Sequence, residues 1–273
     1  MSRVRILTGS SHLLWNSGVT IGTLERSHIH MMPGLVSTPN PRQNGVLAIL
    51  PESESKRLFP HLELVRLSSG EALYESTGSL IHVYFPITAI VSMRYVLENG
   101  VSSEIAMVGN KGVVGIALFM GGGTMLLRAI VRNAGQAYRL KTQVLQDEFN
   151  RAGALQQLLL RYTLALLTQT AQTAVCNRHH TVEQQICRWL LLSLDRLPSN
   201  ELRMTQKLIA SMIGIRRESV VAVAGKLQSA NLISYVRGRI RVIDRSGLEA
   251  RACECYGIVR KEYRRLLPEL TAE

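Results

Sequence analysis

The sequence predicts an α+β protein with an antiparallel β-domain, a long helix after it, and a winged helix-turn-helix near the C-terminus. Three observations predict this order. Turn residues recur roughly every ten positions over residues 62–140, as in a sandwich, roll or barrel. Apolar residues follow a helical period over 152–176. Two short helix patterns joined at a glycine, with two short strands after them, occupy 205–243.

Composition limits the partners. The chain has 273 residues, enough for two domains, and its 46% apolar content suits a packed core. The net charge of +12 predicts a polyanion partner, with nucleic acid first and an anionic membrane second. The apolar run 113–120 is too short to span a membrane, and no apolar segment follows Arg3 and Arg5 as a secretory signal requires. Four scattered cysteines suit reduced thiols, so we expect a cytoplasmic location.

The N-terminal part divides into two regions. Residues 1–45 are rich in Ser, Pro and Asn and weakly periodic, so we expect a poorly ordered extension. A short helix is predicted over 46–60, and the first domain is predicted to cover 46–150. Within it, Asn99-Gly100 predicts a hairpin turn between strands at 91–97 and 101–108, because both residues tolerate positive φ.

The long helix, assigned to 151–178, is apolar on two faces. One face carries residues at alternating steps of four and three: Leu155, Leu159, Tyr162, Leu166, Gln169, Thr173 and Cys176. The second face carries Leu160, Leu164, Leu167, Ala171 and Ala174. We expect the first face to pack on the β-domain and the second on another copy of the helix. Polar Gln169, Gln172 and Thr173 favour such a dimer seam, and a fully buried internal helix is the alternative.

A new helix is predicted to begin at Thr181, which forms a capping-box pattern with Gln184, and the last domain is assigned to 179–273. Farther on, Thr205 is a candidate cap for the first helix of the helix-turn-helix, and Gly214 suits its left-handed end. Two strands around the basic turn 237–239 predict the wing.

The exposed face of this segment is predicted to bind DNA. Arg217 can bond guanine and Glu218 can accept from cytosine at the leading end of the second helix. The candidate DNA-contacting residues are Thr205, Gln206, Arg216, Arg217, Glu218, Ser219, Val221, Lys226, Arg237 and Arg239. Residues 201–250 carry nine Lys/Arg against four Asp/Glu. A three-helix bundle with a solvated basic face, or a winged helix used for protein contacts, is the alternative.

The sequence TQKLIASMIGIRRESV at 205–220 resembles the helix-turn-helix of the cyclic-AMP receptor protein/Fnr (Crp/Fnr) family. In that family an Arg-Glu pair and then Ser/Thr-Val open the recognition helix, which matches 217–220. The resemblance covers about 46–250 and implies a cyclic-nucleotide-binding-like jelly roll (the β-roll), a dimerisation helix and a winged helix. It also implies a transcription regulator that binds duplex DNA as a homodimer and contacts RNA polymerase if it is an activator. Ala222 stands where relatives often carry another base-contacting residue, so recognition is expected to be narrower or shifted to Arg216.

The predicted effector site departs from the family pattern. Cyclic-nucleotide binders resemble Gly-Glu-Leu-Ala and then Arg-Ser-Ala, whereas residues 115–118 are Gly-Ile-Ala-Leu. Ile116 replaces the glutamate that takes the ribose, and Leu127 replaces the phosphate-binding arginine unless the register shifts to Arg128. A buried phosphate without its counter-charge is costly. We therefore expect no cyclic-AMP response by the usual route, predict no cofactor, and leave the effector unassigned.

Metal binding and catalysis are not predicted. The oxygen-sensing branch of the family uses N-terminal cysteines, and no cysteine precedes Cys176. Cys253 and Cys255 could bind a metal only with a third ligand, so an idle or buried thiol pair is expected. The group His179-His180 with Glu183 is expected to act as a hinge or cap. Because no catalytic constellation is present, an enzyme with a DNA-binding appendage is the weakest alternative, and a constitutive DNA binder with a scaffold-only β-domain is the main rival.

Overall fold

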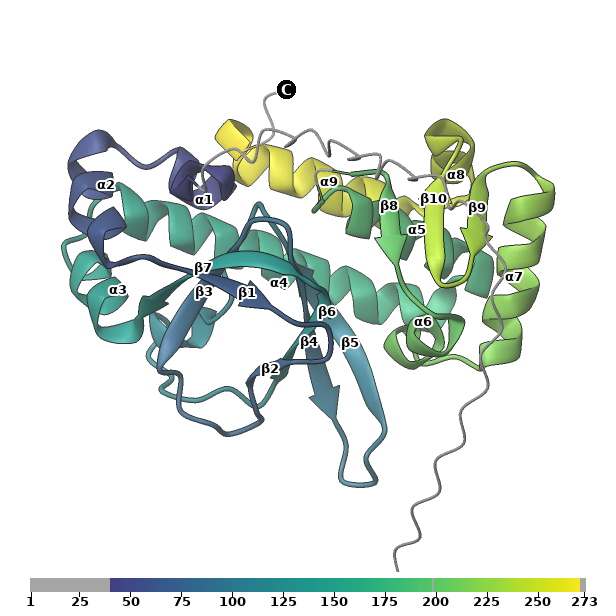
Figure 1. Cartoon of the computed structure of the whole chain (residues 1–273), viewed down its shortest axis with the longest axis horizontal. Helices are drawn as coiled ribbons and strands as arrows, with labels where there is room; N and C mark the ends of the chain where they lie inside the picture. The colour runs from purple at the N-terminus through teal and green to yellow at the C-terminus, as the bar shows by residue number, and fades with distance from the viewer. Residues whose placement is uncertain (1–39, 198, 271–273) are drawn as a thin grey trace, which may run out of the picture. The chain divides into compact units, whose positions relative to one another are not determined.

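A computed structural model describes residues 40–197 and 199–270 (Figure 1). Most of the expected extension, residues 1–39, lies outside this part. Over 40–45 the expectation of disorder is wrong. Asn40 and Gln43 form a capping box around the 3-10 helix η1 (Pro41–Gln43), and the Asn44 side chain caps α1 (Gly45–Ala48). The Asn44 amide is buried and donates to two backbone carbonyls of the β-domain, so local capping and a long-range anchor order this segment.

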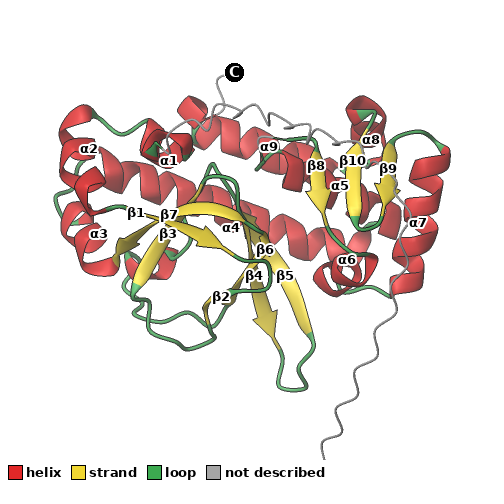
Figure 2. Ribbon diagram, in the orientation of Figure 1, coloured by secondary structure: helices red, strands yellow, loops and turns green. Residues whose placement is uncertain are grey.

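The β-domain consists of two antiparallel sheets with strand orders β1-β7-β3 and β2-β6-β4-β5, which form the expected β-roll (Figure 2). The strands are β1 (Glu63–Leu67), β2 (Ala72–Tyr74), β3 (His82–Pro86), β4 (Ile90–Val96), β5 (Ser102–Val108), β6 (Arg128–Asn133) and β7 (Gly135–Lys141). At position 135, the first residue of β7, only glycine fits, because a Cβ there would lie 2.5 Å from the backbone of Thr88 and Ala89.

The predicted hairpin between β4 and β5 is present, but its turn differs. Leu97 and Val101 close the turn through a backbone hydrogen bond of 2.8 Å, and three residues lie between them. Of the pair Asn99-Gly100, only Gly100 has a positive φ, of 80°. The Asn99 side chain instead accepts a hydrogen bond from the Val101 backbone N–H at 3.0 Å. The turn is therefore a three-residue loop with its left-handed residue last.

Helices pack against the roll. These are α2 (Glu52–Leu58), η2 (Phe59–His61), η3 (Ile116–Leu118), α3 (Thr142–Phe149) and α4 (Ala154–His179). Gly153 precedes α4 and offers no capping side chain. The buried Glu54 carboxylate of α2 takes that role, since it accepts from the N–H groups of Ala154 and Leu155 at 2.7 and 2.8 Å. A carboxylate at this end of a helix also interacts favourably with the helix dipole.

Helix α4 has one buried and one exposed face. All seven residues of the first predicted face are buried, from Leu155 to Cys176, whereas Leu164 and Leu167 of the second are 45% and 63% exposed. The expectation that the polar residues mark a dimer seam is wrong for Gln169 and Thr173. They lie on the buried face, where the Gln169 amide bonds the Met107 carbonyl and the Arg196 guanidinium. The helix also continues past the predicted break, to His179.

The C-terminal part contains the expected winged helix-turn-helix. Its helices are α5 (Val182–Leu194), α6 (Gln206–Ile213), α7 (Arg217–Ser229), α8 (Arg245–Arg251), α9 (Glu254–Leu266) and η4 (Pro268–Leu270). Its strands are β8 (Glu201–Arg203), β9 (Ile233–Val236) and β10 (Arg239–Val242), in the order β8-β10-β9. The predicted capping box between Thr181 and Gln184 opens α5. Strand β8 was not predicted.

Helix α9 returns toward the roll. It packs along α4 (Figure 1), and the end of α9 together with η4 brings Leu266, Leu267 and Leu270 into the core that the roll shares with α4. Helix α9 also places Tyr256 and Val259 in the hydrophobic core of the winged helix-turn-helix, so the C-terminal segment contributes to the cores of both parts. The domain boundaries near 150 and 178 remain predictions.

Candidate nucleic-acid interface

The helix-turn-helix is formed by α6 and α7, and local capping fixes both ends of the turn. The Thr205 side chain accepts from the Leu208 N–H at the start of α6. Gly214 ends α6 with φ 78°, and the N–H groups of Gly214 and Ile215 both donate to the Ala210 carbonyl. This left-handed end requires glycine and lets α7 begin within three residues.

The first turn of α7 presents the predicted base-contacting side chains to solvent. Arg216, Arg217 and Glu218 are exposed, and Ser219 is half-buried. The inward positions are Val220, Val223, Ala224 and Leu227, all of them buried. Of the other predicted contacts, Thr205, Val221, Lys226, Arg237 and Arg239 are exposed and Gln206 is half-buried. No predicted DNA-contacting residue lies in the protein core.

These residues do not form one continuous strip. Arg217 and Lys226 are nine positions apart on α7, about 180° around the axis at about 100° per residue. They flank the exposed face from opposite edges, whereas Val221 lies near Arg217. Arg217 and Glu218 therefore lie on a different edge of α7 from Lys226, and the two groups could meet different parts of a duplex.

The wing lies next to the N-terminus of α6. Its turn has Arg237 at φ 48° and Gly238 at φ 77°. The Gly238 carbonyl accepts from the Met204 N–H at 2.6 Å, and the Tyr235 hydroxyl donates to the Met204 carbonyl at 2.7 Å. The wing and the start of the helix-turn-helix are thus joined through one residue.

The unpredicted strand β8 adds a basic residue that the sequence analysis missed. Arg203 on β8 lies directly opposite Arg239 on β10, and both are exposed. Like charges at a directly paired position destabilise a sheet. The other basic residue of β10 has an opposite charge across the strand pair, because Arg241 faces Glu201 and forms an ion pair with it at 3.5 Å. Two facing guanidinium groups suit a polyanion, so Arg203 joins the candidate phosphate contacts.

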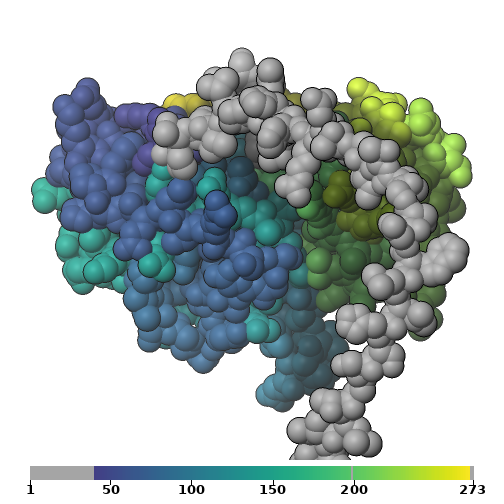
Figure 3. Space-filling view, viewed as in Figure 1, coloured from purple at the N-terminus to yellow at the C-terminus, as the bar shows by residue number. Residues whose placement is uncertain are grey.

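In this structure the helix-turn-helix (α6 and α7, called the recognition unit below) and the preceding helix α5 contact strand β5 of the roll. A Cβ at Gly214 would lie 3.4 Å from the Ser103 hydroxyl of β5, and the Trp189 indole of α5 donates to the buried Glu104 carboxylate at 3.0 Å. Burial raises the pKa of Glu104, and the nearby Ser92 hydroxyl, the charge of Arg132 and the hydrogen bond from Trp189 oppose the rise. The C-terminal domain lies beside the roll, and the β4–β5 hairpin projects beyond the rest of the roll (Figures 1 and 3).

Comparison with known families gives a match over this segment. Residues 184–251 match the Crp-like helix-turn-helix domain, a span that contains α6, α7 and the wing. Comparison with curated proteins found no match. Among solved structures, FixK2 of Bradyrhizobium japonicum is similar with a TM-score of 0.62 and 17% identity, over 70% of this chain and 98% of FixK2.

Two further structures share the fold. A CRP-family transcriptional regulator of Thermus thermophilus, TTHB099, is 18% identical with a TM-score of 0.56, over 69% of this chain and 96% of its own. CLP, the c-di-GMP-responsive global regulator of Xanthomonas campestris, is 20% identical with a TM-score of 0.55, over 70% and 99%. The chain has the Crp/Fnr fold and carries a Crp-like helix-turn-helix domain. The resemblance stated from the sequence is confirmed.

In this Crp/Fnr-type roll, the segment that corresponds to the nucleotide-binding pattern is η3. Gly115, at φ 116°, precedes it, and Ile116 is packed against the core. Arg128, the one basic residue that a register shift would place near a phosphate, donates a hydrogen bond of 2.7 Å to one Glu75 carboxylate oxygen, and its Nε lies 2.5 Å from the other oxygen. Its charge is therefore already matched by a carboxylate.

The described residues line a partly open cavity of about 840 Å³ in another place, between the end of β5, α4, the end of α5 and α9. Tyr162 and Tyr263 line it together with the cationic side chains of Lys111, Arg260 and Arg264. An apolar and aromatic wall with several cations suits an anionic ligand with a ring.

Two further features concern membranes and metal ions. Among the described residues, no helix is both long and apolar enough to cross a membrane. Cys253 and Cys255, which were expected to be an idle or buried thiol pair, are buried, and they lie beside Cys176 and His180. His179 is exposed, and Glu183 is paired with Arg251 at 2.9 Å, so neither joins this group.

Proposed function

We propose that the chain is a cytoplasmic transcription regulator that binds duplex DNA as a homodimer and has no catalytic activity. One observation carries the proposal: Arg216, Arg217 and Glu218 are exposed on the leading turn of α7, within a Crp-like helix-turn-helix domain. Guanidinium and carboxylate groups at this end of a recognition helix can contact base edges in the major groove. Arg203, Lys226, Arg237 and Arg239 are exposed on the same domain and carry charge suited to phosphates.

A second copy is proposed to cover the exposed face of α4. Leu160, Leu164 and Leu167 are 46%, 45% and 63% exposed, and Ala171 and Ala174 extend the stripe at alternating steps of three and four residues. This spacing is typical of a seam between two helices. A twofold dimer would place two α7 helices toward successive major grooves, so the operator is expected to be pseudo-palindromic. A contact with RNA polymerase is proposed only if the protein activates transcription.

The direct test is selection of bound duplexes from a random library, and then affinity measurement at several salt concentrations. The expected result is two half-sites about one helical turn apart and a linear fall of log K with log salt. Absence of salt-sensitive association with any duplex would overturn the proposal.

We further propose that cyclic AMP is not the effector by the usual route. Ile116 in place of the glutamate and the pairing of Arg128 with Glu75 support this. The cationic cavity beside α9 favours an anionic effector elsewhere, whereas the lost phosphate-binding pair favours a constitutive DNA binder with the roll as scaffold.

Thermal unfolding against a nucleotide panel separates these two versions. The panel includes cyclic AMP and c-di-GMP, the latter because CLP responds to it. A saturable stabilisation that is lost in Arg264→Glu, a cavity residue, supports an effector in the cavity. No stabilisation by any nucleotide supports the scaffold version.

A further inference from the structure

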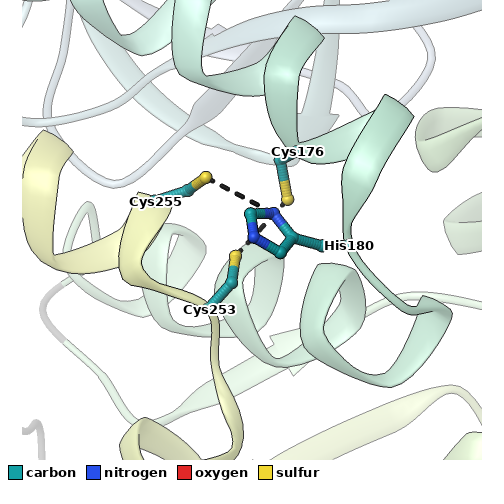
Figure 4. A group of neighbouring side chains, drawn as sticks. All are labelled: Cys176, His180, Cys253 and Cys255. Atoms are coloured by element: carbon teal, nitrogen blue, oxygen red, sulfur yellow. Dashed lines mark hydrogen bonds between the residues drawn. The ribbon is translucent and has the colours of Figure 1, made fainter.

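Four metal-ligating side chains meet where α4 ends and α9 begins (Figure 4). Cys176 lies in the last turn of α4, and His180 is the C-terminal cap of that helix. Cys253 caps the start of α9, and Cys255 lies in its first turn. The two pairs come from segments more than seventy residues apart, and their side chains point toward a common centre (Figure 4).

Two separations between donor atoms are close to those of a tetrahedral site. Bonds of about 2.3 Å to sulfur and about 2.1 Å to nitrogen place two sulfurs about 3.8 Å apart and a sulfur and a nitrogen about 3.6 Å apart. Here the Sγ atoms of Cys176 and Cys253 are 3.5 Å apart, and Cys255 Sγ is 3.6 Å from His180 Nδ1. All four donor atoms lie within 4.8 Å of one another, so small side-chain rotations complete the tetrahedron.

The surroundings of His180 also match a metal ligand. Its Nδ1 faces the thiols, while its Nε2 lies 3.2 Å from a carboxylate oxygen of Glu254. Metal-bound histidines almost always donate their other ring N–H to a carboxylate or carbonyl, which fixes the ring and the tautomer. The Gln185 amide holds the same turn, since it donates to the His180 carbonyl at 2.9 Å.

The charge balance also suits a divalent cation. Three thiolates and a neutral imidazole around a dication leave one net negative charge. Arg188, which is only 4% exposed, interacts electrostatically with both Cys176 and Cys255 and can offset that charge. The three cysteines are buried, so bulk water does not compete for the site.

We propose that Cys176, His180, Cys253 and Cys255 form a structural zinc site that fastens the end of α4 to the start of α9. Three thiolates and an imidazole are the ligands of a closed Cys₃His zinc site, in which no position is left for substrate. An iron–sulfur cluster would spread its ligands over several metal ions, whereas these four donors surround one point. A Cys176–Cys253 disulfide would leave the approach of His180 and Cys255 unexplained.

The location of the site indicates what a bound zinc would stabilise. His180 ends α4 and Thr181 caps α5, so the site lies at the hinge between the long helix and the helix-turn-helix domain. A zinc ion there closes the chain from Cys176 to Cys253 and fixes the direction in which α5 leaves α4. Metal loss is therefore expected to loosen the C-terminal domain relative to α4.

The first experiment measures the metal content of the full-length protein, purified without chelator, by mass spectrometry of the elements. Wild type is expected to carry about one zinc per chain. Cys176→Ser, Cys253→Ser and Cys255→Ser should each lose it. Cys187→Ser is the matched control, because Cys187 is equally buried in α5 but lies outside the cluster, and it should keep its zinc.

A second measurement does not depend on the folding of the cysteine variants. Chelator-treated wild type is titrated with Co²⁺ and then with Zn²⁺. We expect the visible spectrum of tetrahedral, thiolate-bound cobalt, its displacement by zinc, and a higher melting temperature with zinc. Glu254→Gln keeps all four ligands and should weaken zinc binding by about 10–100-fold.

Three results would overturn the site. These are wild type without bound metal and without a cobalt spectrum, bound iron with inorganic sulfide, and a Cys176–Cys253 disulfide in protein kept under reducing conditions.

Discussion

The Arg94 guanidinium on β4 donates hydrogen bonds to both the hydroxyl and the backbone carbonyl of Ser211 on α6, at 2.9 and 3.2 Å. Arg94 is 8% exposed. One charged side chain of the roll thus bonds directly to the first helix of the helix-turn-helix. Through this contact the position of the recognition unit depends on the roll.

Removal of this contact should loosen the docked domain. Ser211→Ala removes only the hydroxyl partner and should lower the free energy of unfolding by about 1 kcal/mol, whereas Arg94→Met removes both bonds and should lower it by about 1.5–3 kcal/mol. Urea denaturation measures the loss, and hydrogen exchange of α6 should rise in both variants. Arg66→Met, at an exposed position of β1, is the control. Unchanged exchange in Arg94→Met would mean that the contact is not formed in solution.

Arg217→Ala should weaken binding to the selected operator by about 1–3 kcal/mol and relax the preference at one base pair. The reason is that Arg217, exposed at the start of α7, is proposed to bond a base edge. Fluorescence anisotropy with operator and point-mutated duplexes measures both effects. Arg66→Ala should leave both unchanged, and an unchanged operator affinity in Arg217→Ala would show that α7 is not the recognition helix.

Arg239→Ala should act differently, because a phosphate contact carries no sequence information. All duplexes should bind more weakly by about the same factor, and the slope of log K against log salt should fall by about one. Arg203→Ala, the residue across the strand pair, should give the same signature. A loss confined to the operator in either variant would contradict the phosphate assignment.

Leu167→Glu should convert the proposed dimer into a monomer, because it places a charge in an apolar seam. Analytical ultracentrifugation measures the mass. Leu126→Glu is a close control, since Leu126 in the roll is 62% exposed and Leu167 is 63% exposed. If both variants stay dimeric, another surface forms the dimer.

The ion pair between Arg57 and Glu148 predicts that the stability of the fold falls at acid pH. A hydrogen bond from Arg57 lowers the pKa of Glu148 below its ordinary value of 4.5. The pair therefore stabilises the fold above that pH, and the contribution is lost as pH falls through the lower folded pKa. Arg57→Gln should show a smaller drop in melting temperature on acidification below about pH 4.5. Lys56→Gln is the control, because its partner Glu52 is 76% exposed.

Much of the architecture was predictable because it is set locally. The capping box at Thr181, the left-handed Gly214 and the apolar faces of α4 and α7 are each contained within a few turns of helix. The family match over 184–251 covers the segment that these signals indicated. The exposed Arg217 follows from the same local periodicity.

What was missed depends on partners distant in sequence. Because Gln169 is polar, the sequence suggested that it lies in a dimer seam. In the structure its amide is buried, and its hydrogen bonds are made with the Met107 carbonyl and the Arg196 guanidinium. Strand β8 has only three residues and is defined by its pairing with β10. The cysteine pair at 253 and 255 lacked a visible third ligand because Cys176 lies 77 positions away.

The wing turn holds Arg237 at φ 48°, a backbone conformation that costs an L-residue about 1–3 kcal/mol and costs glycine almost nothing. At this position Arg237→Gly would relieve strain and at the same time delete a cation. This one substitution would then raise the stability of the fold and lower the affinity for DNA. A screen for heat-resistant variants would be expected to discard the side chain that we propose contacts nucleic acid.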